Sequence, residues 1–291
     1  MDSKNCKMLL TALETGSLTA AAERLGYTPS GVSRAIETLE KQAGFPIIKR
    51  TRRGVMLTRE GKKLLPTIKE FVRLSDTYDQ QSAEFNGLHV GTVAVGTAYA
   101  NFYPWLAHLL LDFHEEHPGI TMRILEGTSS ELTRMVDDRQ LDFGLTSQRK
   151  GNNRWIPLVE DELVAIVPRN HRLASEARVN AQEFAREPFI ELHPGRESDN
   201  SLFMAERGIT PNVVFSTNDS LAMFTMVGAG MGISLINGIT AKHLSSGIIS
   251  IPLEPPCRID CGVITPTEEE ISPAARRFFE FAMSRKDQLP R

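Results

Sequence analysis

Hydrophobic positions in the first part of the chain recur at helical spacing in three separate runs. The runs contain Met8, Leu9, Ala12 and Leu13, then Leu18, Ala21, Ala22 and Leu25, and then Val32, Ile36 and Leu39. Gly26 separates the last two runs, where a tight turn between helices needs a residue that tolerates positive φ. Thr28 is a good N-cap for the third helix, and Pro29 suits its first position. The pattern predicts a helix-turn-helix whose second helix starts at Pro29.

Downstream of these helices, two short apolar runs, residues 45–48 and 55–57, flank a turn rich in arginine. Seven residues at 49–63 are basic, and Glu60 is the one acid among them. On charge alone a solvated surface loop explains the segment equally well, but the helices upstream favour a β-hairpin wing. Such a wing would bring arginines to phosphates or to the minor groove. Those arginines are Arg50, Arg52 and Arg53.

The stretch from Leu57 to Phe85 carries apolar and small residues at spacings of four and three in alternation. Such a heptad seam is typical of a coiled-coil contact, and its members are Leu57, Gly61, Leu64, Ile68, Phe71, Ser75, Tyr78, Ser82 and Phe85. We expect one long helix that begins at Thr58 and is bent or loosened at Pro66. Its contacts with a second copy of the chain are expected at Leu64, Ile68, Phe71 and Tyr78. The alternative is a helix packed against the C-terminal part of its own chain.

From Gly91 onward, short β-rich runs alternate with helical segments. Strands are expected at residues 92–96, 121–126, 141–145, 163–167, 189–192, 213–217, 232–236 and 262–265, and helices at 104–116 and 221–227, among others. This alternation predicts α/β layers with mostly parallel sheets.

Polar residues follow the carboxyl ends of the expected strands, which is where open α/β sheets bind their ligands. They are Thr97, Tyr99, Thr128, Ser129, Thr146, Ser147, His193, Arg196 and Asn218. Hydroxyl and amide groups at helix starts suit a carboxylate or another small anion, with Arg196 and His193 as its charge partners. The bland alternative is that several of them are plain N-caps, since Thr128 and Glu131 have the spacing of a capping box.

Charge divides the 291-residue chain into two parts, although its overall formal charge is only −3. Residues 1–65 carry 12 Lys and Arg against 6 Asp and Glu, whereas residues 66–291 carry 21 against 30. The first part therefore has a net charge of +6 and the second of −9. This asymmetry favours a polyanion as the partner of the first part only.

Several classes of protein are disfavoured by what the sequence contains. We expect no membrane span, because no apolar stretch approaches the ~20 residues that one needs, and no signal peptide at the amino terminus. Three cysteines argue against a disulfide framework, and Cys257 and Cys261 would lie about 13 Å apart on an extended segment, beyond disulfide range. The histidines form no metal motif, and neither a phosphate loop nor a nucleophile elbow occurs. We expect a cytoplasmic protein without metal or cofactor.

The same residues carry a family resemblance. The runs 16–26, 32–40, 44–46 and 57–61 resemble the DNA-binding domain of LysR-type transcriptional regulators. Many members have Gln at the start of the recognition helix, where this chain has Pro29. Base readout would therefore depend more on Ser30, Ser33, Arg34 and the wing. The DNA contacts that we expect are Thr19, Thr28, Pro29, Ser30, Ser33, Arg34, Arg50, Arg52 and Arg53.

The resemblance extends to the C-terminal part and implies the whole domain organisation. It implies a winged helix-turn-helix (1–58), a linker helix that forms dimers (59–88) and an α/β effector-binding domain (89–291). The last resembles type 2 periplasmic binding proteins, with subdomain I at about 89–162 and 265–291 and subdomain II at about 163–264. Residues 218–220 and 228–233 resemble the family's second-subdomain helix and strand.

The implied function is that of a DNA-binding transcription factor under small-molecule control. It would bind a pseudo-palindromic promoter site as a homodimer or homotetramer, respond to a small effector, expected to be an organic anion, and contact RNA polymerase when it activates. Two other hypotheses are an enzyme on a binding-protein fold, for which His193 is the one catalytic candidate, and an architectural DNA-binding protein without a ligand.

Overall fold

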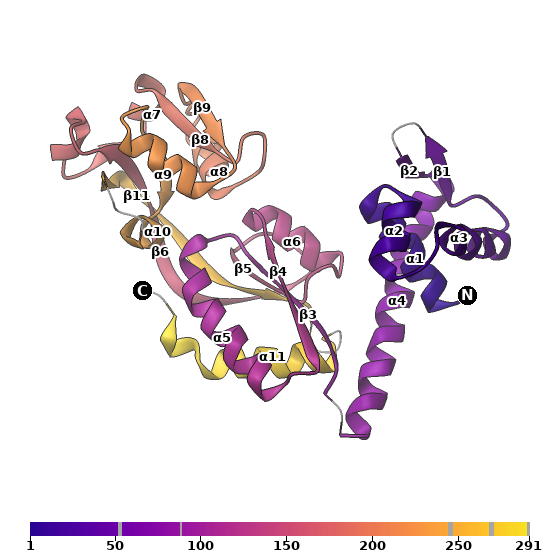
Figure 1. Ribbon diagram of the computed structural model, residues 1–291. Coiled ribbons are helices and arrows are strands. Elements are labelled where there is room, and N and C mark those ends of the chain that lie inside the picture. Colours follow the sequence, from indigo (N-terminus) through magenta and orange to yellow (C-terminus); the bar gives the residue numbers. More distant parts are fainter. Residues whose placement is uncertain (52–53, 88, 244–246, 268–270, 290–291) are drawn as a thin grey trace. The chain divides into compact units, whose positions relative to one another are not determined.

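A computed structural model describes residues 1–51, 54–87, 89–243, 247–267 and 271–289 of the chain. The chain divides into two compact units, Met1–Leu88 and His89–Arg291, each with its own hydrophobic core (Figure 1). None of the described helices is both long and apolar enough to cross a membrane.

The first unit begins with three short helices, α1 (Ser3–Thr15), α2 (Leu18–Leu25) and α3 (Pro29–Ala43). Side-chain oxygens of Ser17 and Thr28 cap α2 and α3 by accepting backbone N–H groups, and Gly26 between them has a φ of +71°. The prediction of a helix that starts at Pro29 behind a Thr28 cap is confirmed.

A two-stranded antiparallel hairpin follows α3, with strands β1 (Ile48–Thr51) and β2 (Gly54–Leu57). The described residues thus confirm a hairpin at the predicted wing, while Arg52 and Arg53 lie outside them. The hairpin is held to the turn after α1, because Val55 N donates to Gly16 O at 2.9 Å. The two backbones approach so closely there that a Cβ at Gly54 would lie 2.4 Å from Gly16 O.

One continuous helix, α4 (Arg59–Phe85), completes the first unit and passes through Pro66. Its first half packs into the unit's own core, where Ile68 is 1% exposed and Leu64 and Phe71 pack beside it. The prediction that Ile68 contacts a second copy is therefore wrong. Leu64 and Phe71 are partly buried against the core of their own unit. The heptad pattern misled because the same periodicity serves packing against α1.

The second half of α4 is different, because its large apolar side chains face solvent. Leu74 is 53%, Tyr78 70% and Phe85 92% exposed. Of the predicted seam, Tyr78 and Phe85 thus remain available to a partner, joined by Leu74, which the seam did not include.

The second unit is built on a seven-stranded sheet with strand order β10-β6-β11-β5-β3-β4, to which β7 adds beside β11. Its strands are β3 (Gly91–Thr97), β4 (Ile120–Glu126), β5 (Phe143–Ser147), β6 (Arg154–Pro168), β7 (Val179–Asn180), β10 (Ser234–Asn237) and β11 (Ile248–Thr265). A separate parallel pair consists of β8 (Phe189–Leu192) and β9 (Val213–Thr217). The helices are α5 (Tyr103–Glu116), α6 (Ser129–Asp137), α7 (Glu183–Arg186), α8 (Asp199–Glu206), α9 (Ser220–Gly228), α10 (Gly238–His243) and α11 (Pro273–Ser284), with short 3₁₀ turns at Ala100–Phe102, Arg172–Ser175 and Lys286–Gln288.

The α/β class is as predicted, and the main sheet mixes parallel with antiparallel pairs where mostly parallel pairs were expected. β3 pairs in parallel with β4 and β5, and β7 pairs in parallel with β11. The pairs β6–β10, β6–β11 and β5–β11 are antiparallel. The predicted strands 163–167 and 262–265 are only the ends of β6 and β11, which are 15 and 18 residues long.

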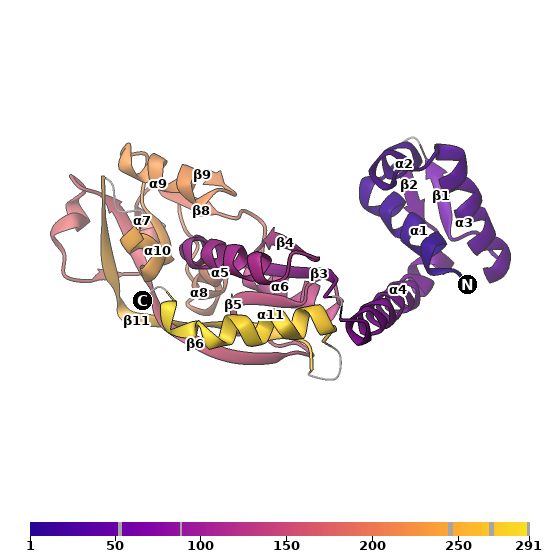
Figure 2. The same cartoon turned by 60° about the horizontal axis from the view of Figure 1, so that its bottom comes forward.

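These two long strands run through two lobes, each with its own core (Figures 1 and 2). On β6, Leu158 and Val159 pack in the first core and Leu163 packs in the second. On β11, Ile259 packs in the second core and Cys261 in the first, so the chain returns earlier than residue 264. Lobe I contains β3–β5, α5, α6 and α11, and lobe II contains β7–β10 and α7–α10.

Candidate functional sites

The first unit exposes the start of α3. Thr28, Pro29, Ser30 and Arg34 are exposed there, and Thr19 is exposed near the start of α2. The Thr28 hydroxyl is 3.1 Å from that of Ser30 and also accepts Gly31 N–H at 3.1 Å. Thr28 therefore both caps the helix and stands at its exposed end.

A side-chain network joins the wing to the recognition helix. Arg50 Nη2, on β1, donates to Ser33 Oγ at 2.7 Å, and Ser33 Oγ donates to Glu37 Oε1 at 2.8 Å. This orders Arg50 over α3, a position that sequence reasoning did not give it. Glu37 was not among the expected residues, since an acid on a face that meets phosphates carries no signal of its own in the sequence.

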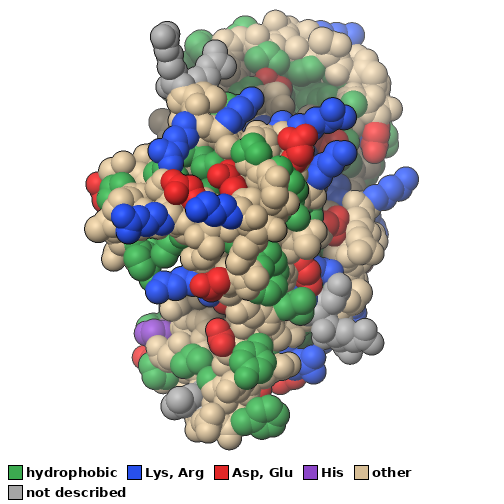
Figure 3. Space-filling view, turned by 90° about the vertical axis from the view of Figure 1, so that its right-hand side faces the viewer, with side chains coloured by type: hydrophobic (Ala, Val, Ile, Leu, Met, Phe, Trp, Pro, Cys, Tyr) green, Lys and Arg blue, Asp and Glu red, His purple; other side chains and the backbone are tan. Residues whose placement is uncertain are grey.

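Figure 3 shows the surface of the first unit, with Lys and Arg side chains in its upper part and exposed hydrophobic side chains toward its lower end. The basic side chains on the exposed parts of β1 and α4 include Lys49, Arg50, Arg59, Lys62 and Lys63. Such a face attracts a polyanion through charge, independently of its sequence.

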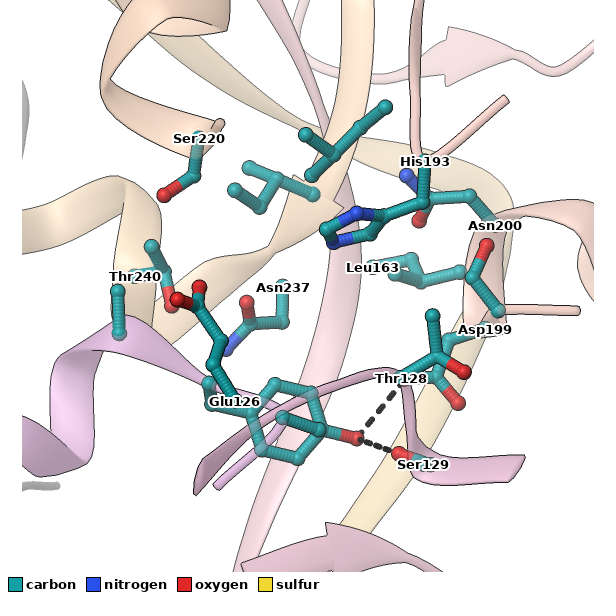
Figure 4. Close-up of a pocket in the computed structure, with 16 residues that line it drawn as sticks. Glu126, Thr128, Ser129, Leu163, His193, Asp199, Asn200, Ser220, Asn237 and Thr240 are labelled. Carbon is teal, nitrogen blue, oxygen red and sulfur yellow. Dashed lines mark hydrogen bonds between the residues drawn. The ribbon is translucent and has the colours of Figure 1, made fainter. Parts of the chain in front are cut away.

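The second unit contains a pocket of about 60 Å³ between its two lobes (Figure 4), several times the volume that one water needs. Lobe I contributes the ends of β3 and β4 and the start of α6, and lobe II contributes the end of β8, the starts of α8 and α9, the end of β10, and α10. The lining residues are Ala98, Tyr99, Ala100, Glu126, Thr128, Ser129, Leu163, Leu192, His193, Ser198, Asp199, Asn200, Ser220, Ile236, Asn237 and Thr240.

Four of the nine sequence-predicted effector residues line this pocket: Tyr99, Thr128, Ser129 and His193. They come from both lobes, so strand-end reasoning brought together the right edges of the sheets. Thr128 also forms the expected capping box with Glu131, so both interpretations of this residue hold.

The other five predicted residues do not line the pocket. Thr97 and Thr146 are buried, and Thr97 Oγ1 donates to the carbonyl oxygen of Tyr99 at 3.0 Å. Ser147 lines a neighbouring hollow instead, and Asn218 is exposed to solvent. Arg196 is the fifth. Thr97 and Thr146 are part of the buried interior and Asn218 faces solvent. The side chains of Ser147 and Arg196 are bonded across the lobe junction, to Asp199 and Glu131 respectively.

Arg196 is occupied by an ion pair across the lobes. Its guanidinium donates to both carboxylate oxygens of Glu131, with Nε at 2.7 Å from Oε1. The hydrogen bonds from Arg196 outweigh burial and hold the pKa of Glu131 down at about 2. Arg196 is therefore not free to neutralise an anionic ligand.

His193 lines the pocket with an unusual backbone, because its φ is +61° in a residue that has a Cβ. Such a conformation costs free energy and is found where the surroundings fix it, often at binding sites. Burial first, and then the charge of Arg196, lower the pKa of His193. It therefore faces the pocket as a neutral imidazole at neutral pH.

A second contact between the lobes centres on Asp199. Its Oδ1 accepts Arg149 Nη2 and Ser147 Oγ, both at 2.5 Å, and its Oδ2 accepts the Tyr99 hydroxyl at 2.8 Å. Burial above all, with the Asp199 charge, raises the pKa of Tyr99 well above its ordinary value. Asp199 is thus held by three lobe I side chains at the floor of the pocket (Figure 4).

Sequence reasoning missed most of the acidic and amide residues of the pocket. Glu126 is the last residue of β4 and projects into the pocket, although strand-end reasoning began one residue too late (Figure 4). Asn237 is the last residue of β10 and Thr240 lies in α10, which follows it, and the antiparallel pairing of β10 with β6 was not foreseen. Within the described ranges, no group of three or more His, Cys, Asp or Glu side chains could hold a metal ion.

A helix-turn-helix with a wing, joined by a long helix to a two-lobed domain with an interlobe pocket, defines a bacterial regulator with a sensing domain. Residues 4–62 match the family described as "Bacterial regulatory helix-turn-helix protein, lysR family", and residues 86–286 match "LysR substrate binding domain". The chain belongs to the LysR family.

Known proteins of similar sequence or structure match most of the chain. The uncharacterized HTH-type transcriptional regulator YvbU of Bacillus subtilis is 27% identical over 279 residues, which is 95% of this chain and 96% of YvbU. The solved structure of full-length CbnR complexed with its target DNA matches with a TM-score of 0.64 at 20% identity, over 98% of this chain and 99% of that chain. The effector-binding domain of QuiR in complex with shikimate matches with a TM-score of 0.57 at 22% identity, over 68% of this chain and 98% of that chain.

The family and fold class predicted from the sequence are confirmed. The chain is a LysR-type DNA-binding transcription regulator with an effector-binding domain. Since this family consists of transcriptional regulators, the enzyme hypothesis built on His193 is set aside.

Proposed function

We propose that this regulator binds a pseudo-palindromic promoter site through α3 and the wing, and that a small polar molecule in the interlobe pocket controls this binding. The pocket carries the proposal: both lobes line it, and Asp199 and Arg196 form contacts from one lobe to the other beside it. A ligand there contacts both lobes and so favours one arrangement of them. This separates the proposal from an architectural DNA-binding protein without a ligand.

On the DNA side, the proposal rests on the exposed start of α3 and on Arg50. Ser30 and Arg34 stand at the exposed face of a helix that suits the major groove, and Arg50 is ordered beside them through Ser33. Arg52 and Arg53, which come between β1 and β2 in the sequence and lie outside the described residues, are proposed to contact phosphates. The structure of CbnR with its target DNA gives a precedent within the family.

A pseudo-palindromic site calls for two copies of the chain, and the second half of α4 offers a surface for one. Leu74, Tyr78 and Phe85 are spaced by four and seven residues, and all three are exposed. A second copy presenting the same stripe would bury both, as in a two-stranded coiled coil. In the second unit, the edge strands β4 and β9 expose Ile124, Val213, Val214 and Phe215, which suits a homotetramer. RNA polymerase is the proposed further partner at promoters that the regulator activates, and the cytoplasm its place of action.

The charge partners expected for an organic anion are not available, although hydroxyl groups at helix starts still line the pocket. Its two charge partners, Arg196 and His193, are respectively ion-paired with Glu131 and held neutral. We therefore propose a small organic effector at this pocket without assigning it a net negative charge.

The test uses the full chain and the DNA upstream of its own gene. Compounds that raise the melting temperature are added to a fluorescence-anisotropy titration of that DNA. We expect Ala98→Phe, which fills the pocket, to keep DNA affinity while the response to the compound disappears. The control is Ala107→Phe on the exposed face of α5, which should behave as wild type. An unchanged response in Ala98→Phe would show that the sensor lies elsewhere.

A further inference from the structure

We infer that the effector carries a primary ammonium group and that Glu126 is the residue that binds it. The inference rests on the proposed function, because it assigns the chemistry of the same pocket. The charges of the pocket wall and the hydrogen-bonding groups that are not bonded to the protein support this assignment.

The charged groups of the pocket wall are all acidic. Among the described lining residues, Glu126 and Asp199 are carboxylates, and neither Lys nor Arg occurs. Asp199 is neutralised by Arg149, with 2.5 Å between Nη2 and Oδ1. Within the described part of the chain, the exposed side chain of Glu126 forms neither an ion pair nor a hydrogen bond, so its carboxylate remains available to a ligand.

The basic side chains close to Glu126 do not supply a free positive charge to the pocket. Arg196 is close enough for Glu126 to raise its pKa, yet its guanidinium hydrogen bonds go to Glu131. His193 is neutral, so it adds no positive charge to the wall. A ligand with a negative group would therefore meet repulsion from Glu126 without a matching cation.

Two amide side chains of the wall also offer an oxygen to the pocket, because each is oriented by a hydrogen bond from its Nδ2 group to another part of the protein. Asn237 Nδ2 donates to Asp161 Oδ2 at 2.8 Å, and Asn200 Nδ2 donates to the carbonyl oxygen of Leu235 at 2.7 Å. Carboxylate and carbonyl oxygens only accept, so these contacts fix the orientation of both amides. Each amide thus keeps its oxygen for the pocket.

Tyr99 follows the same pattern, since its hydroxyl hydrogen goes to Asp199 and its oxygen keeps lone pairs. Acceptor oxygens therefore lie in the wall together with Glu126 and with the hydroxyl groups of the wall. An ammonium group has three donors and no acceptor, and it satisfies a carboxylate and neighbouring amide oxygens together. Figure 4 shows Glu126 and Asn237 on the same side of the pocket, where one such group would meet both.

The experiment compares matched pairs of compounds on the full chain by calorimetric titration. Each α-amino acid is paired with its 2-hydroxy acid, and each primary amine with its alcohol, so that only the nitrogen changes. We expect binding in the nitrogen-bearing members alone, and about tenfold weaker binding in Glu126→Gln, which keeps the side-chain shape but removes the charge. The two pair types distinguish an amino acid from a simple amine.

Glu115→Gln, on the exposed face of α5, is the matched control and should bind as wild type. The inference is overturned if hydroxy compounds bind wild type and Glu126→Gln alike, although the pocket would still be the sensor. It is also overturned if an amine binds both proteins equally. Binding that survives in Ala98→Phe would instead reject the pocket itself, and with it the proposed function.

Discussion

At the scale of single residues, the charges at the lobe junction hold one another in place. Glu131 caps α6, pairs with Arg196 across the junction, and is about two-thirds buried, with 31% of its side chain exposed. This carboxylate gains hydrogen bonds on folding, so its contribution to the free energy of unfolding depends on pH. The direction of that dependence follows from its pKa shift.

The Glu131 carboxyl has an ordinary pKa of 4.5 and a folded-state pKa of about 2. A depressed pKa stabilises the folded state above the ordinary value, and this contribution is lost as pH falls from 4.5 toward 2. We expect Arg196→Met to lower the free energy of unfolding at pH 7 by roughly 1 kcal/mol after solvent screening, and by much less near pH 2. Urea unfolding across this pH range measures the difference.

Arg258→Met is the control for that series, because Arg258 and Glu160 are both about four-fifths exposed and 3.8 Å apart. An exposed pair of this kind should contribute little at any pH. If both variants lose the same stability, independent of pH, the Arg196 pair has no special role.

The proposed role of Arg50 is to add affinity for any DNA, while that of Ser30 and Arg34 is to recognise the operator. We expect Arg50→Ala to weaken binding to the operator and to unrelated duplexes alike. The slope of log K against log salt concentration should become shallower by about one for each DNA-bound copy of Arg50, because one phosphate contact is lost. Anisotropy titrations at several salt concentrations give the slope. Lys150→Ala, an exposed cation of the second unit, should leave it unchanged. A loss confined to the operator would mean that Arg50 reads bases.

At the scale of elements, the two halves of α4 differ in their surroundings. Its first half is part of a folded core, and its second half exposes an apolar stripe. Mutations in the first half should therefore lower stability, whereas mutations in the second half should affect association.

We expect Tyr78→Glu with Phe85→Glu to give folded monomers in analytical ultracentrifugation, because a charge in the stripe would have to be desolvated without a partner. Ile68→Ala should instead lower the stability of the first unit by about 2–5 kcal/mol, as a large-to-small change in a core does, with dimers retained. Dimers that persist in the Tyr78 and Phe85 variant would place the contact on the second unit.

At the scale of the whole molecule, two units with separate cores should respond separately to a ligand. We expect an effector at a hundredfold excess over its dissociation constant to stabilise residues 89–291 by about 2.7 kcal/mol. Calorimetry of the full chain should show the melting transition of the second unit rise while that of the first stays in place. If both transitions move together, the two units unfold as one.

Local chemistry explains what the sequence could predict. Thr28 and Pro29 define a helix start by themselves, so the recognition helix was predictable. Strand-end reasoning reached Tyr99 and Thr128 because it needs only the order of strands and helices. It failed for Asn237 and Thr240, whose position depends on how β10 pairs with β6, and for Ile68, whose burial depends on a neighbouring helix. Those features arise from contacts between distant segments, which periodicity does not record.

The close approach between the wing and the turn after α1 also limits how this regulator can evolve. A side chain at position 54 would collide with the backbone oxygen of Gly16, and the φ of +106° at Gly54 disfavours any other residue. Selection for a new operator can therefore act more easily on exposed residues of α3 such as Ser30 and Arg34 than on Gly54. In a library that samples every residue of the hairpin, Gly54 should be the position where even alanine is lost.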